Sequence, residues 1–323
     1  MTEVSEDQSY KLNTLKLQEK FLDGLRLDGK SANTLKNYKT DLGRFNEFLL
    51  KTKNKIDIST TQLPEILEYG KYLEEKYTSD NSRRRRVQTL RKFFDFLVEK
   101  QIFPTNPVRK IPSSPKFVDI PRPAHLLEIK TLWHHLIDKS KNENPLSQLM
   151  AIRDQLIMLL VYEAGLKISD IQKLKIEHIK GGVNLRVLIT PLKRDPYTIP
   201  LSDVFLCIFK DYYHLLEKFK EKENLVFNEM FFNANSYKIL SGGLSTRGIE
   251  KIFEEFRKKL ILNITPKSLR QACIFKWIIE GQSDDQIKEW LAVAPSYSLK
   301  AYHENMENKY YESEFLLQYL EMY

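Results

Sequence analysis

The chain has 323 residues and a formal net charge of +8, with 42% hydrophobic and 29% charged residues. This length favours two domains, and a glycine count of 11 argues against a loop-rich all-β fold. The longest apolar run, LIMLLVY at 156–162, is too short for a membrane span, and the polar, acidic N-terminus lacks a signal-peptide core. We therefore expect a cytoplasmic protein without a membrane segment, whose two distant cysteines, Cys207 and Cys273, are free thiols.

The positive charge is concentrated in the first part of the chain. Residues 1–120 contain 23 Lys and Arg against 17 Asp and Glu, an excess of 6, whereas the remainder has 28 against 26. A basic front region suggests a polyanionic partner, with nucleic acid as the first candidate. The alternative is a solvated basic surface, because many domains carry this charge without binding anything.

Four or five amphipathic helices are expected in the front region. Apolar residues recur at helical spacing in 13–30, in 31–53 and in 61–77, and a fourth segment follows Ser79–Asp80 as RRRRVQTLRKFFDFLVEK. Ser31 or Asn33 is a candidate N-cap for the second helix. Since no strand pattern interrupts these segments, they predict a small helical bundle over residues 1–110.

A proline-rich segment separates the two predicted domains. Five of the 13 prolines lie in 105–125, so we assign 111–125 as an interdomain linker. The second domain, 126–323, opens with helices at about 126–139 and 146–164. Short strands are expected in IEHIKGGVNLRVLIT and YTIPLS, around a hairpin at 191–197. This domain is predicted to be mainly α with a small antiparallel sheet, because helical patterns then dominate at 202–219, 246–258, 266–280, 284–291 and in a tail from about 296.

The densest positive cluster is a run of four arginines, Arg83, Arg84, Arg85 and Arg86. Successive helix residues are rotated by about 100°, so the four cannot all lie on one face. Arg83, Arg86 and the later Lys92 can share a flank. A solvated face is one interpretation, but we expect no acid to neutralise this cluster. We therefore favour guanidinium groups held against phosphates at a helix N-terminus.

Two motifs in the front region carry a resemblance to a known family. The pattern S-x-x-T-hydrophobic-x-x-Y-x-x-D-L-x-x-F occurs with Ser31, Thr34, Leu35, Tyr38, Asp41, Leu42 and Phe45. The run RRVQTLRKFFDFL follows, and then NPV at Asn106–Val108 before the linker. In these features the front region resembles the core-binding domain of tyrosine recombinases of the Xer and phage-integrase type. The resemblance continues over about residues 15–305 and implies the family's two-domain fold and double-stranded DNA as the partner.

The second domain is similar to the family's catalytic domain, with departures. Segment 153–179 matches the first catalytic box through Tyr162, Gly165, Leu166, Ser169 and Asp170, but Lys167 takes the place of the catalytic arginine. The family's hairpin lysine falls at Leu192 on a direct count back from Pro200–Leu201. A slip of one residue assigns it to Lys193, with Arg194 as the second choice.

The second and third boxes retain an arginine and a tyrosine. The family's P-H-x-L-R-H reads PKSLRQ here, so Arg270 is kept, while Lys267 and Gln271 take the places of the two histidines. The third box reads LAVAPSYSLKAY, with an unbroken register from Leu291 to Tyr302 and Val293 in the histidine-or-tryptophan place. The alternative for Tyr302 is an aromatic packing residue.

The resemblance implies a reaction at a DNA phosphodiester that needs neither a metal ion nor a cofactor. Tyr302 attacks the phosphorus and forms a 3′-phosphotyrosyl link, while Arg270 and Lys167 stabilise the negative charge that develops. Lys267 and Gln271 are expected to donate to the phosphate, and Lys193 is the candidate general acid. Because lysine lacks the bidentate fork of a guanidinium, Lys167 predicts a slower enzyme.

Further residues are expected to bind DNA or to be bystanders. The expected DNA-contacting residues are the four arginines with Lys36, Lys39, Lys92 and Arg194. The histidines show no metal-ligand spacing. His303, directly after Tyr302, is expected to be solvated.

The apolar tail SEFLLQYLEMY suggests how copies of the chain assemble. In the family, such segments dock into a neighbouring protomer. We favour this interpretation, a homotetramer on paired DNA sites assembled through the C-terminal helix, over a helix folded back onto its own domain. The main alternative function is a catalytically impaired recombinase fold that acts as a DNA-binding accessory or regulator. Lys167 and Val293 favour that alternative, whereas Tyr302 and Arg270 oppose it.

Overall fold

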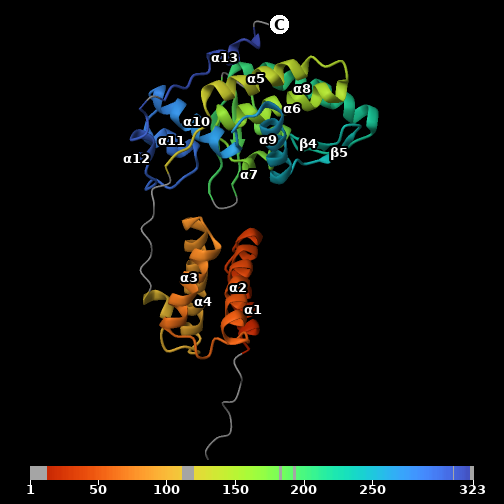
Figure 1. The fold of residues 1–323 in the computed structure, drawn as a ribbon. Helices are drawn as coiled ribbons and strands as arrows, with labels where there is room; N and C mark the ends of the chain where they lie inside the picture. The colour runs from red at the N-terminus through yellow and green to blue at the C-terminus, as the bar shows by residue number, and fades with distance from the viewer. Residues whose placement is uncertain (1–12, 111–119, 182–183, 192–193, 308, 321–323) are drawn as a thin grey trace, which may run out of the picture. The chain divides into compact units, whose positions relative to one another are not determined.

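The computed structural model of the chain describes residues 13–110, 120–181, 184–191, 194–307 and 309–320. The chain folds as two compact units, Met1–Phe117 and Val118–Tyr323 (Figure 1). Most of the predicted linker 111–125 lies outside the described residues. Its described end belongs to the second unit, because Ala124 is buried in that unit's core and its N–H donates to the carbonyl of Ser268 at 3.0 Å.

In its described residues, 13–110, the first unit is a bundle of four helices, within the four or five that the sequence predicts. They are α1 (Thr14–Leu27), α2 (Ala32–Lys53), α3 (Leu63–Lys76) and α4 (Asp80–Glu99), followed by the 3₁₀ turn η1 (Pro107–Lys110). Ser31 caps α2 by accepting a hydrogen bond from the Thr34 N–H. The apolar stripes of the helices meet in one core, which is rich in aromatic rings such as those of Phe45, Phe93 and Phe94.

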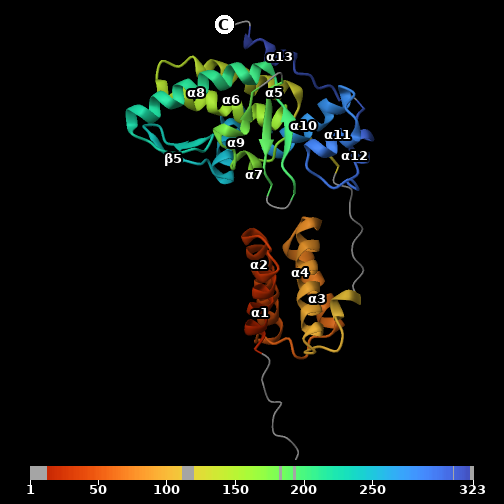
Figure 2. The ribbon, with the colours of Figure 1, turned by 180° about the vertical axis from the view of Figure 1, so that it is seen from behind.

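The second unit is built around α6 (Pro145–Tyr162), which is buried on all sides. It packs against α5 (Leu126–Ser140), α8 (Asp203–Glu223) and α10 (Pro266–Ile279), and Figure 2 shows it among these helices. Neighbouring helices cover every face of α6, so its apolar run LIMLLVY lines the core. The remaining helices before the tail are α7 (Ile168–Ile171), the 3₁₀ turn η2 (Ile176–His178), α9 (Thr246–Leu260) and α11 (Asp284–Trp290).

Two small antiparallel sheets complete the second unit. The first has the order β1-β2-β3, from β1 (Ile179–Lys180), β2 (Arg186–Ile189) and β3 (Tyr197–Pro200). This confirms the predicted strands around the 191–197 hairpin. The second sheet, β4 (Phe232–Ala234) with β5 (Ile239–Gly242), is absent from the prediction. The mainly α fold with a small antiparallel sheet is confirmed.

The C-terminal tail differs from its prediction. Instead of one helix from about 296, the described tail, residues 296–307 and 309–320, has two single α-helical turns, α12 (Lys300–His303) and α13 (Glu314–Leu317). The tail packs on its own unit, with Phe315 and Leu316 buried in the core. The Tyr162 hydroxyl donates to the Glu312 carbonyl at 2.7 Å, and α13 lies beside α5 (Figures 1 and 2). The single chain thus adopts the folded-back arrangement, which was the less favoured of the two expectations.

Two further expectations concern the membrane and the thiols. No helix in the described part of the chain is long and apolar enough to cross a membrane. Cys207 and Cys273 are both free, and Cys273 is buried in the core of the second unit.

Candidate active site

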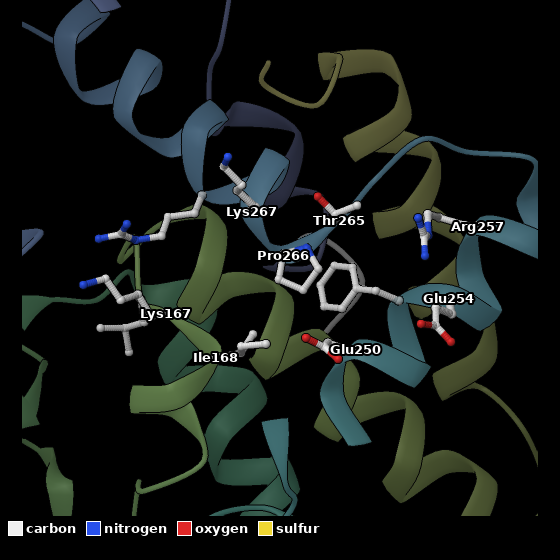
Figure 3. A pocket seen from close by; sticks show the side chains of 11 residues that line it. Lys167, Ile168, Glu250, Glu254, Arg257, Thr265, Pro266 and Lys267 are labelled. Atoms are coloured by element: carbon white, nitrogen blue, oxygen red, sulfur yellow. The ribbon is translucent and has the colours of Figure 1, made fainter. Parts of the chain in front are cut away.

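A pocket of about 610 Å³ in the second unit brings together several of the predicted site residues. The N-terminal ends of α7 and α10 form one side of it, and α9 forms the other (Figure 3). Its lining residues are Leu166, Lys167, Ile168, Glu250, Phe253, Glu254, Arg257, Thr265, Pro266, Lys267 and Arg270. Lys167, Lys267 and Arg270, which come from distant parts of the sequence, therefore line one cavity.

Arg270 is held in place by main-chain carbonyl groups. Its Nε donates to the Gly165 carbonyl at 2.5 Å, and its Nη2 donates to the Leu291 carbonyl at 3.3 Å. These bonds use two of the five guanidinium N–H groups and leave the others for an anion. Burial is the main cause that lowers the pKa of Arg270. A buried, anchored guanidinium is a strong electrostatic partner for a phosphate.

Gly165 permits this anchorage because it has no side chain. Its φ is +59°, in the left-handed region, and a Cβ there would lie 2.6 Å from the Trp277 ring. The turn that follows α6 can therefore approach α10 closely, which brings the Gly165 carbonyl to Arg270. The glycine of the first catalytic box, Gly165, is thus needed for the close approach that anchors Arg270.

Lys167 lies at the N-cap of α7, immediately after this turn. Burial is the main cause that lowers its pKa, and the positive charges of Arg270 and Arg194 lower it further, while Asp170 raises it. The positive charge of Arg194, from the hairpin, thus acts on Lys167 in addition to that of Arg270. A cluster of cations that repel one another becomes favourable when an anion binds among them.

Tyr302 projects from the single turn α12 toward α10. Its side chain is 7% exposed, and its ring lies 5.3 Å from that of Phe275, between centroids. The Tyr302 hydroxyl also acts electrostatically on Arg270, where it opposes the burial that lowers the pKa of the guanidinium. The structure therefore brings Tyr302 into the neighbourhood of Arg270, as the sequence motifs imply.

The other predicted catalytic positions have mixed outcomes. Lys267 is exposed at the start of α10 and lies at the edge of the pocket (Figure 3). The Gln271 Oε1 accepts from the Arg122 N–H at 3.1 Å, so this side chain fastens residues 120–125 to α10. Val293 is half-buried and packs against the core. Lys193 lies outside the described residues.

Two residues that do not line the pocket act electrostatically on its cations and are missing from the predicted set. The Tyr197 hydroxyl, on β3, has its pKa raised to about 12, mainly by burial and then by the carboxylate of Asp170. Arg270 and Arg194 act on the same hydroxyl in the opposite direction. Asp170 also acts on Lys167 and Arg270. The sequence signal for Asp170 was its place in the first box, but Tyr197 carries no motif of its own.

The arginine run of the first unit does not match its prediction. Acids lie beside it: Arg83 pairs with Asp80, and Arg85 pairs with the buried Asp41 at 2.8 Å. The expectation of a cluster without a neutralising acid is therefore wrong, because α2 supplies a carboxylate 44 positions away in the chain.

Arg86 in particular is engaged inside the first unit. Its guanidinium carbon lies 3.7 Å from the centroid of the Tyr77 ring, and its Nη1 donates to the Ser82 carbonyl at 2.8 Å. The residue is 8% exposed. Arg86 thus stabilises the bundle, and DNA contact by it has no support in this geometry.

The three predicted lysines of the first unit are all exposed. Lys92 donates to the Tyr38 hydroxyl at 3.0 Å, and Lys36 and Lys39 lie near the start of α2. DNA contact by these residues, and by Arg84 and Arg194, stays a prediction.

The donor set of the pocket suits an anion. Cationic nitrogen atoms bind phosphate oxygens, and a nearby tyrosine hydroxyl can act as a nucleophile toward a phosphorus atom held there. Among the residues that the structure describes, no cluster of three or more His, Cys, Asp or Glu side chains could hold a metal ion.

Comparison with family models gives two matches that together cover most of the chain. The model of the phage integrase N-terminal SAM-like domain matches residues 19–101, and that of the phage integrase family matches residues 130–309. The second match includes Lys167, Arg270 and Tyr302.

Curated relatives are tyrosine recombinases of similar length. Tyrosine recombinase XerC of Leptospira interrogans serogroup Icterohaemorrhagiae serovar copenhageni is 25% identical over 281 residues, which cover 84% of this chain and 83% of the relative. Tyrosine recombinase XerD of Listeria monocytogenes serovar 1/2a is 25% identical over 296 residues, covering 88% and 93%.

Solved structures share the fold. XerH site-specific recombinase bound to the palindromic difH substrate, in a post-cleavage complex, aligns with a TM-score of 0.67 at 14% identity, over 95% of this chain and 81% of that chain. A lambda integrase tetramer bound to a Holliday junction aligns with a TM-score of 0.65 at 15% identity, over 94% and 80%. Since a family model covers more than half of its residues, the chain belongs to the phage integrase family.

Proposed function

We propose that this chain is a site-specific DNA recombinase that cuts and rejoins DNA through Tyr302. The observation that carries this proposal is that Lys167, at the N-cap of α7, and Arg270 of α10 line one pocket, while Tyr302 of α12, outside the lining of that pocket, acts electrostatically on Arg270. The curated relatives named above are tyrosine recombinases, which supports the same reaction for this chain.

In the proposed reaction the Tyr302 oxygen attacks the phosphorus of a DNA phosphodiester. A bond forms between that oxygen and phosphorus, and the bond from phosphorus to the 5′-oxygen breaks. The phenol gives up its proton, and the departing 5′-oxygen takes up a proton, for which Lys193 is our candidate donor. Attack by a 5′-hydroxyl on the phosphotyrosyl link reverses these steps, so strands can be exchanged without an external energy source.

The cations would act on the charge of the transition state. Arg270 has N–H groups left for the non-bridging oxygens, and its carbonyl anchors fix their direction before DNA arrives. Lys167 supplies a single point charge in the place of a guanidinium. Burial and neighbouring cations lower the pKa of Lys167, and a bound phosphate would raise that pKa again.

We also propose how the two domains and several copies cooperate. Both units would contribute contacts to the same DNA duplex, with Lys36, Lys39, Lys92, Arg84 and Arg194 on phosphates. A tetramer on paired sites is consistent with the lambda integrase structure described above, which is a tetramer bound to a Holliday junction. In such an assembly the tail of one copy would leave its own unit and dock on the next.

A catalytically impaired DNA-binding regulator is the second candidate. It is favoured by Val293, which packs without a polar group at a position that the family motif gives to histidine or tryptophan, so one hydrogen-bond donor is missing there. Gln271 does not add to this case, because it accepts the Arg122 N–H through its Oε1 and keeps its amide N–H groups as donors.

Trapping of a covalent complex tests the proposal. Duplex sites would first be recovered from a random-sequence pool by binding, and a nicked version of the recovered site would then trap the cleaved intermediate. We expect a protein–DNA adduct on a denaturing gel that disappears in Tyr302→Phe. Tyr310→Phe is the matched control, because Tyr310 is 65% exposed on the same tail and should leave the adduct intact. Tight binding without an adduct would select the regulator instead.

A further inference from the structure

The segment that carries Tyr302 is short and needs support from outside itself. α12 is a single turn of four residues, Lys300–His303, with Tyr302 and His303 side by side. It follows an irregular connection from the end of α11, in which Ala292 has a left-handed φ of +49° and residues 294–298 are exposed. One isolated helical turn is not stable on its own. The direction of the Tyr302 hydroxyl therefore depends on what holds this turn.

A polar contact joins the turn to α11. The His303 Nε2 lies 2.8 Å from the Asp284 Oδ1, and the two side chains are 47% and 45% exposed. Because a carboxylate can only accept, the Nε2 is the donor. Asp284 is the first residue of α11, and that helix is fixed to α10 through the Trp277 and Trp290 rings, whose centroids are 5.0 Å apart.

The two neighbouring side chains of α12 point to different partners. Successive residues on a helix are rotated by about 100°, so Tyr302 can face Phe275 of α10 while His303 faces α11. Rotation of the turn about its axis would move both side chains together. A bond that fixes His303 thus also fixes the direction in which the Tyr302 hydroxyl points.

We propose that His303 and Asp284 are positioning residues that orient the nucleophile-bearing turn for attack. This inference rests on the proposed function, because it assigns the pair a role in the reaction of Tyr302. A pair exposed to this degree contributes little to overall stability. Its effect is therefore expected in the rate of the chemical step and not in DNA affinity or in the melting of the second unit.

The test measures the rate of adduct formation at saturating nicked duplex, together with the DNA dissociation constant. We expect His303→Ala to lower the rate by about 3- to 10-fold, as for the loss of one hydrogen bond, while the dissociation constant changes by less than about twofold. His303→Gln, whose amide nitrogen can reach the Asp284 carboxylate, should recover most of the rate. Asp284→Ala should match His303→Ala, and the double variant should be no slower than either single variant.

Lys300→Ala is the matched control on the same turn. Lys300 pairs with Glu304 at 3.4 Å within the turn and its continuation, and both side chains are largely exposed, so its removal leaves the contact with α11 intact. This variant should keep the wild-type rate within about twofold. Equal losses in Lys300→Ala and His303→Ala would overturn the proposal, as would additive losses in the double variant.

A second measurement separates this proposal from the proposed function. If wild-type protein forms no adduct, recombination through Tyr302 has failed, and the contact is judged by amide hydrogen exchange over residues 299–305. If these amides exchange faster in His303→Ala than in Lys300→Ala, and slowly again in His303→Gln, the contact between His303 and Asp284 stabilises the turn. Equal exchange in all three variants overturns it.

Discussion

Two groups of cations in this molecule look alike in the sequence and differ in the structure. In the first unit, Arg83 and Arg85 are matched by Asp80 and Asp41, and Arg86 lies over the Tyr77 ring. In the second unit, burial lowers the pKa of both Lys167 and Arg270, the charge of Arg270 lowers that of Lys167 further, and carbonyl groups fix the guanidinium.

The difference shows why charge density alone does not locate an anion site. Cations that already have an internal carboxylate or an aromatic ring gain little from a phosphate, because part of their charge is compensated. Lys167 and Arg270 interact with the carboxylate of Asp170, but burial outweighs it and the pKa of each is lowered, so an anion among them relieves more unfavourable energy. The run of four arginines is therefore partly structural, whereas the scattered cations of the pocket form the stronger candidate site.

The largest effect is expected for Arg270→Ala. Removing this anchored guanidinium should lower the rate of adduct formation by about 10²–10³-fold, as for the loss of one preorganised donor in a transition state. The measurement is single-turnover trapping on nicked duplex at saturating protein. An unchanged rate would contradict the assignment of the pocket as the active site.

Asp41→Ala tests the arginine run of the first unit, and the quantity measured is the free energy of unfolding. It leaves the cationic partners of a fully buried carboxylate without compensation, so the free energy of unfolding of the first unit should fall by about 2–4 kcal/mol, a value reduced for the partial exposure of Arg85. Denaturant titration measures this. Glu47→Ala, which removes pairs that are largely exposed, is the control and should cost less than about 1 kcal/mol.

Lys167→Arg should increase the rate of adduct formation. A guanidinium at this position restores bidentate geometry, and we expect adduct formation to be about tenfold faster. The lowered pKa of Lys167 means that the wild-type enzyme loses this charge at a lower pH than an ordinary lysine would. At subsaturating concentrations, where the ionisation of the free enzyme governs the rate, the rate should therefore decline on the alkaline side below pH 10.5, the ordinary lysine value, and Lys167→Arg should abolish that decline.

The same group has a consequence for stability. Between its lowered folded pKa and its ordinary unfolded pKa, Lys167 binds more protons in the unfolded chain, so its contribution to the free energy of unfolding rises with pH. That contribution is complete above the unfolded pKa and is lost as pH falls through the folded pKa. Denaturation of wild type and Lys167→Met across alkaline pH would show it, and parallel pH curves would contradict the sign.

The smallest effects separate surface lysines from Arg86. Lys36→Ala and Lys39→Ala should each reduce the slope of log binding constant against log salt by about 1 and leave the unfolding free energy unchanged. Arg86→Ala should leave the salt slope unchanged and lower the unfolding free energy, because its guanidinium is engaged with Tyr77 and Ser82 inside the bundle. A reduced slope in Arg86→Ala would return it to the DNA-contacting set.

The helices and the first hairpin could be predicted because their signals are local. Ser31 stands directly before an apolar stripe and caps α2, and the 191–197 turn lies between two β-rich runs. The second hairpin was missed because its strands have only three and four residues, with a shift of register at Asn233 and Ala234. Its one clear signal is the Asn235 side chain, which accepts from the Tyr237 and Lys238 N–H groups in the turn.

The site could be predicted only in part, because its contacts are distant in the chain. The motifs identify Arg270, Lys167 and Tyr302. These residues are too far apart in the chain for helical or strand periodicity to relate them. They do not indicate that Gln271 binds the Arg122 N–H, or that Tyr197 joins the site from β3. Asp41 and Arg85 form an ion pair although they are 44 positions apart in the sequence, and no local pattern predicts such a pair.

The seating of the C-terminal segment has a consequence for how an assembly can form. Tyr311, Phe315 and Tyr319 fill positions on the same chain that carries them, with Tyr311 donating to the Ala124 carbonyl at 2.9 Å. A tethered segment competes for its own position at an effective concentration on the order of millimolar. A free second copy carries the same segment, so at micromolar concentration it competes at a disadvantage of about 10³ in concentration. Exchange of the C-terminal segment would therefore be promoted when two copies occupy neighbouring binding sites on one DNA molecule. It would depend much less on the concentration of protein in solution.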